Sequence, residues 1–439
     1  MSLLHQNSCE CIKSELDFFS VPPSQQMILG TQDVEFYPVS PIIAGTVIDV
    51  VVPPCAGEYL YDVNGARLNG VGRLTGATAA AADALPAEAP VNLIPHSCFS
   101  HVELILNGKQ TSCGSHMYPY KSYIETHLGY GSDAKASHLT NRLYYADTAW
   151  NFNKRTADNE GYEKRAKLFK GGRSIDIVTP ISLPFLNQQR MLLSGVEMRF
   201  RFHFSKPEFH IMGPENSSAQ FEWTSFSLTI PRAQISPSVL LAQSRALETA
   251  TAKYPICRTE CKTLTINAGL RSKVFDSVYL GQLPKRVILG MVDNTAFNGA
   301  YTENPFNFDH MDLSFAALYI NGVQVPARGL NPDFTHARST KYADCYQTLF
   351  SGSGVHHKDE GNGIDREAYP GGNCFLIFDL SPDRSSHEGH WNLQQTGCLR
   401  IELRFKRDLV KAVNLVVYAE FQSLIEIDKY RTVHTDYST

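Results

Sequence analysis

The sequence is short of cysteine, tryptophan and clustered positive charge. Its 439 residues include 10 Cys and 3 Trp, charged residues make up 19%, and the formal net charge is −4. Lys and Arg occur at most in pairs, such as Lys164-Arg165 and Lys406-Arg407. Because nucleic-acid backbones and anionic membranes attract clustered Lys and Arg, we expect no tight direct nucleic-acid binding.

Targeting and membrane segments are also missing. Residues 1–19 have neither the basic start nor the apolar core of a signal peptide, and no apolar run approaches the roughly 18 residues of a membrane span. We therefore expect synthesis in the cytoplasm and no membrane span. The ten cysteines are too scattered for a disulfide-dense scaffold. We expect most of them to be free thiols.

The common catalytic motifs are absent as well. The sequence has no G-x-x-x-x-G-K-[ST] phosphate loop, no G-x-S-x-G nucleophile elbow and no H-E-x-x-H zinc helix. We therefore predict that the protein is not an enzyme. The same absences predict no catalytic, cofactor-binding or metal-binding residues and no cofactor.

Two groups of residues could still be considered as metal ligands. The cysteine pairs Cys9-x-Cys11 and Cys257-xxx-Cys261 are the only close ones, and a structural zinc site requires four converging ligands. Imidazole and carboxylate groups also gather in segments rich in Gly, Ser, Asp and Pro, which are typical of solvated loops. The members of this loop group are His356, His357, Asp359, His387, Glu388 and His390. We interpret both groups as structural.

What the sequence does contain is a strong β pattern. The 24 Phe and 20 Tyr favour half-buried pleated surfaces. Residues 196–204 alternate between apolar and charged or His side chains, and residues 399–406 repeat this alternation. Such a pattern indicates a strand with one buried face. Further predicted strands are Thr46–Val52, Val102–Leu106, Phe221–Ile230, Leu264–Ile266, Arg286–Val292, Ala317–Ile320, Phe375–Leu380 and Val413–Phe421.

Two hairpins and two helices punctuate these strands. Asn107-Gly108 and Asn321-Gly322 each follow an apolar strand, and Asn-Gly supplies the positive φ angles of a tight hairpin. Each pair is followed by a segment with apolar residues at helical spacing, Tyr120–Leu128 and Lys341–Phe350. We predict an amphipathic helix after each hairpin.

The two halves of the chain therefore carry the same landmarks in the same order, at an offset of roughly 200 to 220 residues. Gly171-Gly172 corresponds to Gly371-Gly372, and Val196–Phe204 corresponds to Leu399–Phe405. A third predicted helix joins the halves, with Ser236 as N-cap, Pro237 as first residue and an end near Lys253. The predicted segments are an N-terminal arm at 1–17, a first domain at 18–232, a helical linker at 233–253, a second domain at 254–427 and a C-terminal tail at 428–439.

A β domain of about 200 residues with many strands and few helices is most simply a two-sheet sandwich, of which the jelly roll is the common eight-stranded form. The predicted fold is therefore all-β, two tandem eight-stranded jelly rolls with short helices in their loops. Two loops are long, the Ala-rich Gly70–Pro90 and the Gly-rich Ser351–Gly372. Long loops at the ends of a sandwich are where partners bind, so we expect subunit contacts there.

Several segments resemble the hexon-like major capsid protein of Polinton/Maverick elements and adintovirus-like DNA viruses. They are Val102-Glu-Leu-Ile-Leu-Asn-Gly108, Tyr118-Pro-Tyr-Lys-Ser-Tyr-Ile-Glu-Thr126, Ile181-Ser-Leu-Pro-Phe185 before the strand at 196–204, and the tail Arg431–Tyr437. The resemblance lies mainly in the first half of the chain. In the second half it concerns the layout of the segments.

This resemblance implies a double jelly roll and a homotrimer shaped as a pseudo-hexagon. Such trimers would build an icosahedral shell around a double-stranded DNA genome, and the protein would reside in the virion. The implied partners are other copies of the chain, neighbouring capsomers, and penton and other minor capsid proteins. The compartment of assembly, cytoplasm or nucleus, stays open.

One alternative comes from another class, a double β-sandwich protein that binds or cleaves carbohydrate. Paired carboxylates such as Asp359-Glu360 would suit a glycosidase only if acid and base faced each other across a cleft. A secreted lectin or glycosidase is also expected to carry a signal peptide and often disulfides. The capsid interpretation is therefore the one that we carry forward.

Overall fold

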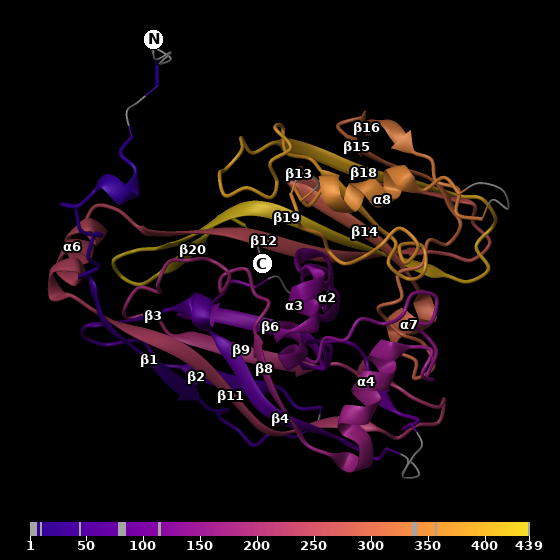
Figure 1. Ribbon diagram of the computed structural model, residues 1–439, viewed down its shortest axis with the longest axis horizontal. Helices are drawn as coiled ribbons and strands as arrows, with labels where there is room; N and C mark the ends of the chain where they lie inside the picture. Colours follow the sequence, from indigo (N-terminus) through magenta and orange to yellow (C-terminus); the bar gives the residue numbers. More distant parts are fainter. Residues whose placement is uncertain are drawn as a thin grey trace.

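The computed structural model describes residues 7–8, 11–43, 45–77, 85–112, 116–335, 340–355 and 358–437. Figure 1 shows two β sandwiches lying one above the other, the first half of the chain in indigo to magenta and the second in orange to yellow. Of the positions considered above, Cys9, Cys113, His356, His357 and residues 78–84 lie outside the described residues. Every helix in the described part is too short or too polar to cross a bilayer.

Eight main strands of the first half form one sandwich. One sheet has the order β1 (Ile28–Phe36), β11 (Gln220–Ile235), β4 (Arg67–Thr75) and β8 (Ile175–Pro180), and β3 (Tyr59–Tyr61) also pairs with β11. The other sheet has the order β2 (Ile48–Val52), β9 (Met198–Phe204), β6 (Phe99–Leu106) and β7 (Lys109–Gln110). A small additional sheet pairs β5 (Ala89–Pro90) with β10 (Ile211–Met212).

The second half repeats this arrangement. One sheet has the order β12 (Ala252–Ile266), β19 (Val413–Ile427), β14 (Arg286–Asp293) and β17 (Phe375–Asp379), and β20 (Val433–Thr435) pairs with β19. The other has the order β13 (Ser272–Gln282), β18 (Thr396–Phe405), β15 (Leu313–Ile320) and β16 (Val323–Leu330). The pairings between these named strands are antiparallel.

Strand order identifies the fold. Numbered along each half, the main strands take the order 1-8-3-6 in one sheet and 2-7-4-5 in the other, in both halves alike. An antiparallel double sheet of eight strands with this Greek-key interleaving is a jelly roll. The predicted all-β double jelly roll is confirmed. β9 and β18 hold the same rank, and we retain 18–232 and 254–427 as proposed domain limits.

The two alternating segments place their apolar sides in the cores, as predicted. Met198, Phe200 and Phe202 of β9 are buried, while Arg199 pairs with Asp49 of β2 on the outer face. The buried residues of β18 are Leu399, Ile401, Leu403 and Phe405, together with the largely buried Glu402. A charged outer face explains why both strands alternate so strictly, since each side chain meets either core or solvent.

Both Asn-Gly pairs form the predicted hairpins. The φ angles are 44° and 80° at Asn107 and Gly108, and 50° and 85° at Asn321 and Gly322. Positive φ at both central residues matches the twist of the flanking strands. Each asparagine side chain also accepts a backbone N–H from the strand alongside, that of Glu197 at 2.8 Å in one half and Cys398 at 2.9 Å in the other. The two hairpins are therefore built alike.

The helix predictions hold with corrections at their ends. α2 (Tyr118–Gly129) and α8 (Ala343–Ser351) follow the hairpins, and α6 (Pro237–Leu247) joins β11 to β12. α6 ends before Lys253, the predicted end of the helix, because Lys253 already belongs to β12, where it pairs with Glu426 of β19. Ser236 occupies the N-cap position, but its side chain makes no capping hydrogen bond. The remaining α-helices are α1 (Ile94–Ser97), α3 (Ser132–Ala136), α4 (Glu160–Phe169), α5 (Pro207–His210) and α7 (Asn294–Asn298).

The predicted loop Gly70–Pro90 is wrong at its start, because residues 70–75 belong to β4 in the middle of a sheet. The glycines that suggested a loop have a packing role. A Cβ at Gly70 would lie 2.7 Å from the ring of Trp223, and one at Gly72 would lie 2.2 Å from the ring of Phe221. Glycine in a strand often marks such a close approach. The two aromatic side chains of β11 thus occupy the space that β4 leaves free.

Candidate functional site

The loop between β17 and β18 contains the only titratable cluster that resembles a catalytic arrangement among the predicted loop residues with described positions. His390 Nε2 lies 2.9 Å from Asp383 Oδ2 and 3.1 Å from Ser385 Oγ. Asn392 donates a hydrogen bond to Asp383 Oδ1 at 3.0 Å. Hydrogen bonds from Ser385 and His390 lower the pKa of Asp383, and the bond to Asp383 raises the pKa of His390.

This cluster has the residues of a Ser-His-Asp triad but the wrong geometry. In a triad, one ring nitrogen of the histidine binds the carboxylate and the other accepts the serine proton. Here the same nitrogen, His390 Nε2, contacts both Asp383 and Ser385, while Nδ1 lies 3.2 Å from Glu388. Because Asp383 and Ser385 share the one nitrogen Nε2, His390 has no other ring nitrogen facing Ser385 to accept its proton. The cluster ties the loop together.

The residues that were considered as possible metal ligands, where the structure describes them, do not form a metal site. His387 lies against Gly354, where a Cβ would approach its ring to 2.2 Å. Across the described ranges, no group of three His, Cys, Asp or Glu side chains is arranged to hold a metal ion. Cys257 and Cys261 lie in β12, and four residues of strand separate them by about 13 Å, too far to share one ion. Cys11 is exposed in the N-terminal segment.

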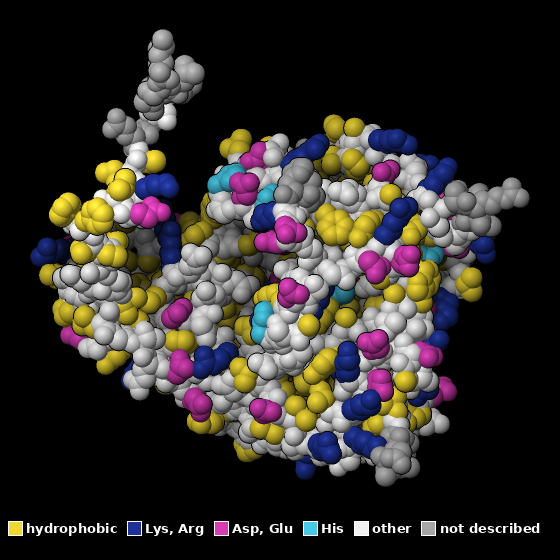
Figure 2. Space-filling model, viewed as in Figure 1, with side chains coloured by type: hydrophobic (Ala, Val, Ile, Leu, Met, Phe, Trp, Pro, Cys, Tyr) yellow, Lys and Arg dark blue, Asp and Glu magenta, His cyan; other side chains and the backbone are white. Residues whose placement is uncertain are grey.

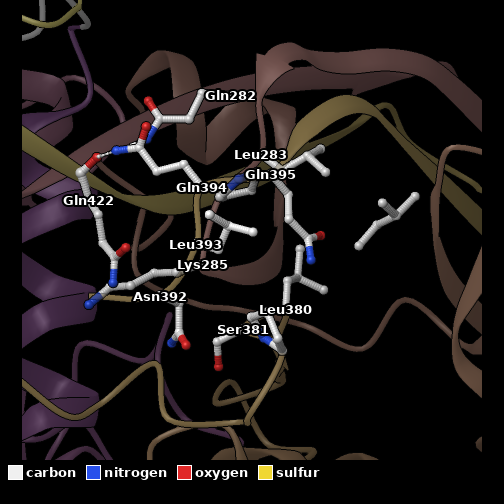
Figure 3. Close-up of a pocket in the computed structure, with 13 residues that line it drawn as sticks. Gln282, Leu283, Lys285, Leu380, Ser381, Asn392, Leu393, Gln394, Gln395 and Gln422 are labelled. Atoms are coloured by element: carbon white, nitrogen blue, oxygen red, sulfur yellow. Dashed lines mark hydrogen bonds between the residues drawn. The ribbon is translucent and has the colours of Figure 1, made fainter. Parts of the chain in front are cut away.

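A narrow cleft beside this loop is lined by both side-chain amides and apolar side chains (Figure 3). Gln282 donates to the carbonyl of Gln422 at 2.8 Å, and Lys285 donates to the carbonyl of Ser386 at 2.8 Å. The volume open to water is about 30 Å³. A water molecule needs ~10–15 Å³ by this kind of measure, so the cleft has room for water but not for a substrate. The first of these bonds joins β13 to β19, and the second fastens the loop to the turn between β13 and β14.

A larger polar cleft of about 500 Å³ opens where loops of both halves meet. Lys411 Nζ lies 3.1 Å from Asp293 Oδ2 and 3.3 Å from Glu303 Oε1, and the two hydrogen bonds raise the pKa of Lys411. Trp150 lies at the edge of this cleft and is exposed. Lys411 therefore compensates the carboxylates of Asp293 and Glu303, while Asp309, Asp312 and Asp408 also line the cleft.

The most extensive built feature is the contact between the two rolls, which we call the inter-roll joint. α2 lies between the rolls in Figure 1 and supplies its centre. The ring of Tyr123 stacks on Phe306 of the second half at 4.3 Å with an interplanar angle of 1°, and Tyr120 meets the same ring edge-on at 5.8 Å. His127 bridges from Tyr144 Oη at 2.8 Å to Asn373 Oδ1 at 2.9 Å. Both aromatic stacking and polar contacts therefore lock the rolls.

A buried ion pair forms the second part of the joint. Arg165 of α4 is fully buried and lies 2.6 Å from Asp147 Oδ1, and it also donates to the carbonyls of Pro90 at 2.9 Å and Tyr145 at 2.6 Å. Asp147 Oδ2 accepts a hydrogen bond at 3.2 Å from Asn304 of the second half. A buried charge is tolerated only when it is paired and hydrogen-bonded, and these contacts meet that requirement.

The second half reaches back in return. The ends of its long strands contribute to the hydrophobic core of the first roll, through Tyr254, Ile256, Ile425 and Ile427. The segment predicted as a C-terminal tail contains β20, which pairs with β19, and the chain beyond β20 contacts the first roll. Arg431 donates to the carbonyl of Ser194 at 2.6 Å, and Tyr437 donates to that of Thr111 at 2.9 Å. Each roll thus contains side chains of the other.

Sequence reasoning found α2 but not its role. The helix is predicted to be amphipathic, yet Lys121, Ser122 and Thr126, which lie outside the apolar spacing, are buried along with its apolar residues. Apolar and aromatic residues spread around a helix indicate burial on all sides, and this was the available signal. α4 was not predicted. The segment Glu160–Phe169 has the charge pattern of an exposed helix, and nothing in it distinguishes Arg165 from its neighbours.

Comparison with known proteins agrees with this architecture. No family model matches the chain. An uncharacterized protein of Caenorhabditis elegans is 26% identical over 357 residues, 79% of this chain and 82% of its own length. A chain in the structure of the Sputnik virophage matches with a TM-score of 0.67 at 11% identity, over 98% of this chain and 93% of that one.

Two further structures are similar along nearly their whole length. A chain of the PBCV-1 virus capsid matches with a TM-score of 0.60 at 9% identity, over 96% of this chain and 100% of that one. The mavirus major capsid protein matches with a TM-score of 0.54 at 10% identity, over 99% and 97%. At such low identity these likenesses show the fold. The chain has the double jelly-roll fold that is found in these viral structures.

Proposed function

We propose that the protein is a major capsid protein, a structural subunit of a virion and not an enzyme. One observation supports this most strongly. Two jelly rolls of identical strand order are joined into one unit by the inter-roll joint, to which both rolls contribute buried side chains. Full-length likeness to viral capsid structures supports the same function. The Polinton and adintovirus relationship suggested by the sequence motifs belongs to this proposal.

The proposed assembly is a homotrimer that forms a pseudo-hexagonal capsomer. A ring of three copies requires two different, complementary surfaces on each copy, and two non-identical rolls in one chain supply them. Three chains then present six sandwiches of the same topology around one axis. We propose that such capsomers tile an icosahedral shell around double-stranded DNA, together with penton and other minor capsid proteins.

The distribution of charged side chains supports a structural role in a shell rather than a role in binding nucleic acid. On the face shown in Figure 2, basic and acidic side chains are interspersed. Many of the basic groups are also engaged in ion pairs, such as Arg67 with Asp33 at 2.5 Å and Lys406 with Asp333 at 2.9 Å. Without a stripe of free positive charge, counterion release can contribute little to DNA binding. Other proteins would therefore contact the genome.

Only part of the long loop Ser351–Gly372 is free to form a contact between subunits of the trimer. Part of Ser351–Gly372 already serves the inter-roll joint, because Gly371 accepts a hydrogen bond from the backbone of Trp150 at 2.8 Å and Tyr369 is buried. Its segment at 358–361 stays exposed. We propose this exposed segment as a contact between subunits, within an obligate interface of more than about 2,000 Å².

Light scattering after size exclusion tests the trimer. The expected mass is about 147 kDa, three times 48.9 kDa, and negative-stain images should show near-hexagonal particles. The double variant Asp359→Lys/Glu360→Lys should weaken the trimer, whereas Glu388→Lys in the β17–β18 loop serves as a matched charge-reversal control. A well-behaved monomer of the unmodified chain at micromolar concentration would exclude this assembly.

The carbohydrate alternative has one feature in its favour, the exposed Trp150 beside the polar cleft. Aromatic faces are common platforms for ligands in sandwich proteins, and two of the nearby carboxylates, those of Asp293 and Glu303, pair with Lys411. Tryptophan fluorescence titrated with mono- and oligosaccharides separates the two functions. A saturable shift that disappears in Trp150→Ala would favour the alternative.

A further inference from the structure

The N-terminal segment is the largest unpartnered apolar feature of the described chain. Every residue from Cys11 to Asp33 is exposed, including most of β1. Twelve of the twenty-one exposed large hydrophobic side chains of the described residues lie between Ile12 and Val47. Phe18 and Phe19 keep 76% and 96% of their surface exposed. Exposed apolar clusters of this kind mark interaction surfaces.

The exposed segment includes residues 11–17 of the predicted N-terminal arm and continues to Met27, and from here on we call residues 11–27 the arm. Figures 1 and 2 show it leaving the body beside α6, with apolar side chains along it. Its base is fixed, because Ser236 donates a backbone hydrogen bond to the carbonyl of Met27 at 2.9 Å. Seventeen extended residues can reach about 55–60 Å, which is enough to cross to a neighbouring copy.

An apolar groove lies beside the base of the arm. It has a volume of about 490 Å³ and is walled by α6, the end of β11 and the start of β12. Its lining includes Leu60, Met191, Ile235, Val239, Ala246 and Tyr254. No residue of α6 is buried, so the groove-facing side of the helix lacks a full partner. This volume falls within the range of ~300–1,000 Å³ of clefts that enclose a ligand.

The charges of the arm and groove are complementary. The arm carries Glu15 and Asp17 on either side of Leu16, with Lys13 as its only described basic residue. The lining of the groove contains Arg190 and Lys253 and no carboxylate. The guanidinium of Arg190 donates to the backbone carbonyl of Lys253, which places the Arg190 charge on the rim of the groove, while the Lys253 ammonium lies 3.8 Å from Glu426.

We propose that the arm of one copy docks into the α6 groove of a second copy of this chain, with Phe18 and Phe19 as apolar anchors and Glu15 and Asp17 near the cationic rim. In a homo-oligomer each copy carries both an arm and a groove, so every donor finds an acceptor. Aromatic anchors in a pocket typically dominate the affinity of such contacts. The contact does not depend on the trimer or on the capsid role, since any assembly of this chain can use it.

Site-directed cross-linking between two tagged full-length chains tests the exchange. One chain carries Phe19→Cys and the other Ala246→Cys, both with Cys11→Ser to remove the exposed thiol of the arm. Under mild oxidation we expect a disulfide-linked pair of about 98 kDa, twice 48.9 kDa, that contains both tags. Leu241→Cys is the matched control, because Leu241 lies on the same helix, is exposed and does not line the groove. Its yield should be at least tenfold lower.

A chain that carries both Phe19→Cys and Ala246→Cys distinguishes exchange from folding back. A disulfide that forms within one chain at high dilution, with no linked pairs at any concentration, would overturn the proposal. Equal yields of cross-linked pair from Leu241→Cys and Ala246→Cys would overturn it as well. Association provides an independent readout. Phe18→Ser/Phe19→Ser and Val239→Asp should each raise the dissociation constant between copies at least tenfold, while Leu241→Asp should leave it within twofold.

The outcomes separate this contact from the proposed function. If arm and groove variants leave a 147 kDa trimer intact but remove larger assemblies, the arm joins one capsomer to another. If the same variants yield monomers, the arm joins subunits within one capsomer. A chain that forms no shell can still give the cross-link. Trimers and shells that are unaffected by every arm and groove variant, without cross-links, would contradict the arm exchange alone.

Discussion

At the scale of single residues, buried polar groups are the sensitive points of this molecule. Arg165 of α4 has no exposed side-chain surface, and its partners come from the loop before the helix, at Tyr145 and Asp147, and from Pro90 of β5. Its carboxylate partner Asp147 also holds Asn304 of the other roll. A change at this one position therefore affects the packing of both rolls.

Arg165→Met should lower the free energy of unfolding by about 3–5 kcal/mol, because it leaves the Asp147 carboxylate buried without a counter-charge. Lys164→Ala is the matched control, since its side chain is 58% exposed and pairs only with Glu160 on the same helix. A change within about 0.5 kcal/mol is expected there. Urea denaturation followed by circular dichroism measures both. Equal effects of the two substitutions would show that the buried pair is not needed.

Buried histidines predict a marked acid sensitivity. Burial, with Arg142 and Lys121 nearby, lowers the pKa of His96 to about 3, and burial lowers that of His210 to about 4. Burial also holds the pKa of His127 well below 6.5. Below pH 6.5 the unfolded chain therefore binds protons that the folded chain excludes, and the free energy of unfolding falls as the pH falls from 6.5 toward the folded pKa values.

Each of these histidines should cost about 1.4 kcal/mol of stability per pH unit over that window. His96→Gln should flatten the dependence of stability on pH by this amount between pH 6.5 and 4.5, even if it lowers stability at pH 7. Thermal melts in a pH series measure the slopes. An unaltered slope in His96→Gln would mean that this ring takes up a proton in the folded state.

At the scale of elements, hairpins with positive φ were easier to predict than strands with mixed composition. Asn-Gly needs no tertiary partner to favour a tight turn, so both hairpins follow from sequence. β4 contains glycines that only the rings of β11 explain, and β1 is an exposed edge strand without strict alternation. Local sequence reports what a segment prefers, whereas these strands depend on their neighbours.

The two hairpins should respond equally to substitution. Gly108→Ala and Gly322→Ala should each cost about 1–2 kcal/mol, because φ is positive at both while the space for a Cβ is open. Gly389→Ala is the control, since it has equal space and no positive φ, and it should be nearly neutral. Chemical denaturation gives the values. Costs at 108 and 322 that match the control would remove the argument that backbone strain fixes these turns.

At the scale of the whole molecule, the two rolls share their cores. Residues of α2 belong to the same buried cluster as the second roll, and the ends of β12 and β19 belong to that of the first. The hydrogen bonds of His127 and Arg431 cross the same boundary. The sandwiches are separate in sheet pairing but not in packing. The two rolls therefore form one unit, because neither roll can rotate without breaking buried contacts.

Chains of residues 1–250 and 251–439 expressed separately should not fold, because each loses apolar partners supplied by the other half. Full-length protein should unfold in a single calorimetric transition. Size exclusion, near-UV circular dichroism and calorimetry test this, and co-expression of the two pieces should restore a folded complex. A cooperative transition in either piece alone would show that its core is self-sufficient.

The sequence by itself determined the strand-rich composition, the duplicated order of landmarks, both hairpins and the inward face of β9 and β18. These follow from local rules, namely the two-residue period of a strand and the conformational freedom of Asn-Gly. Tertiary structure decided that α2 is buried on all sides, that Arg165 has a buried partner and that the glycines of β4 receive aromatic rings. It also placed Asp383, Ser385 and His390 together without making a catalytic triad. Each of these depends on groups distant in the chain, whose distance and orientation are set only when the two sandwiches pack.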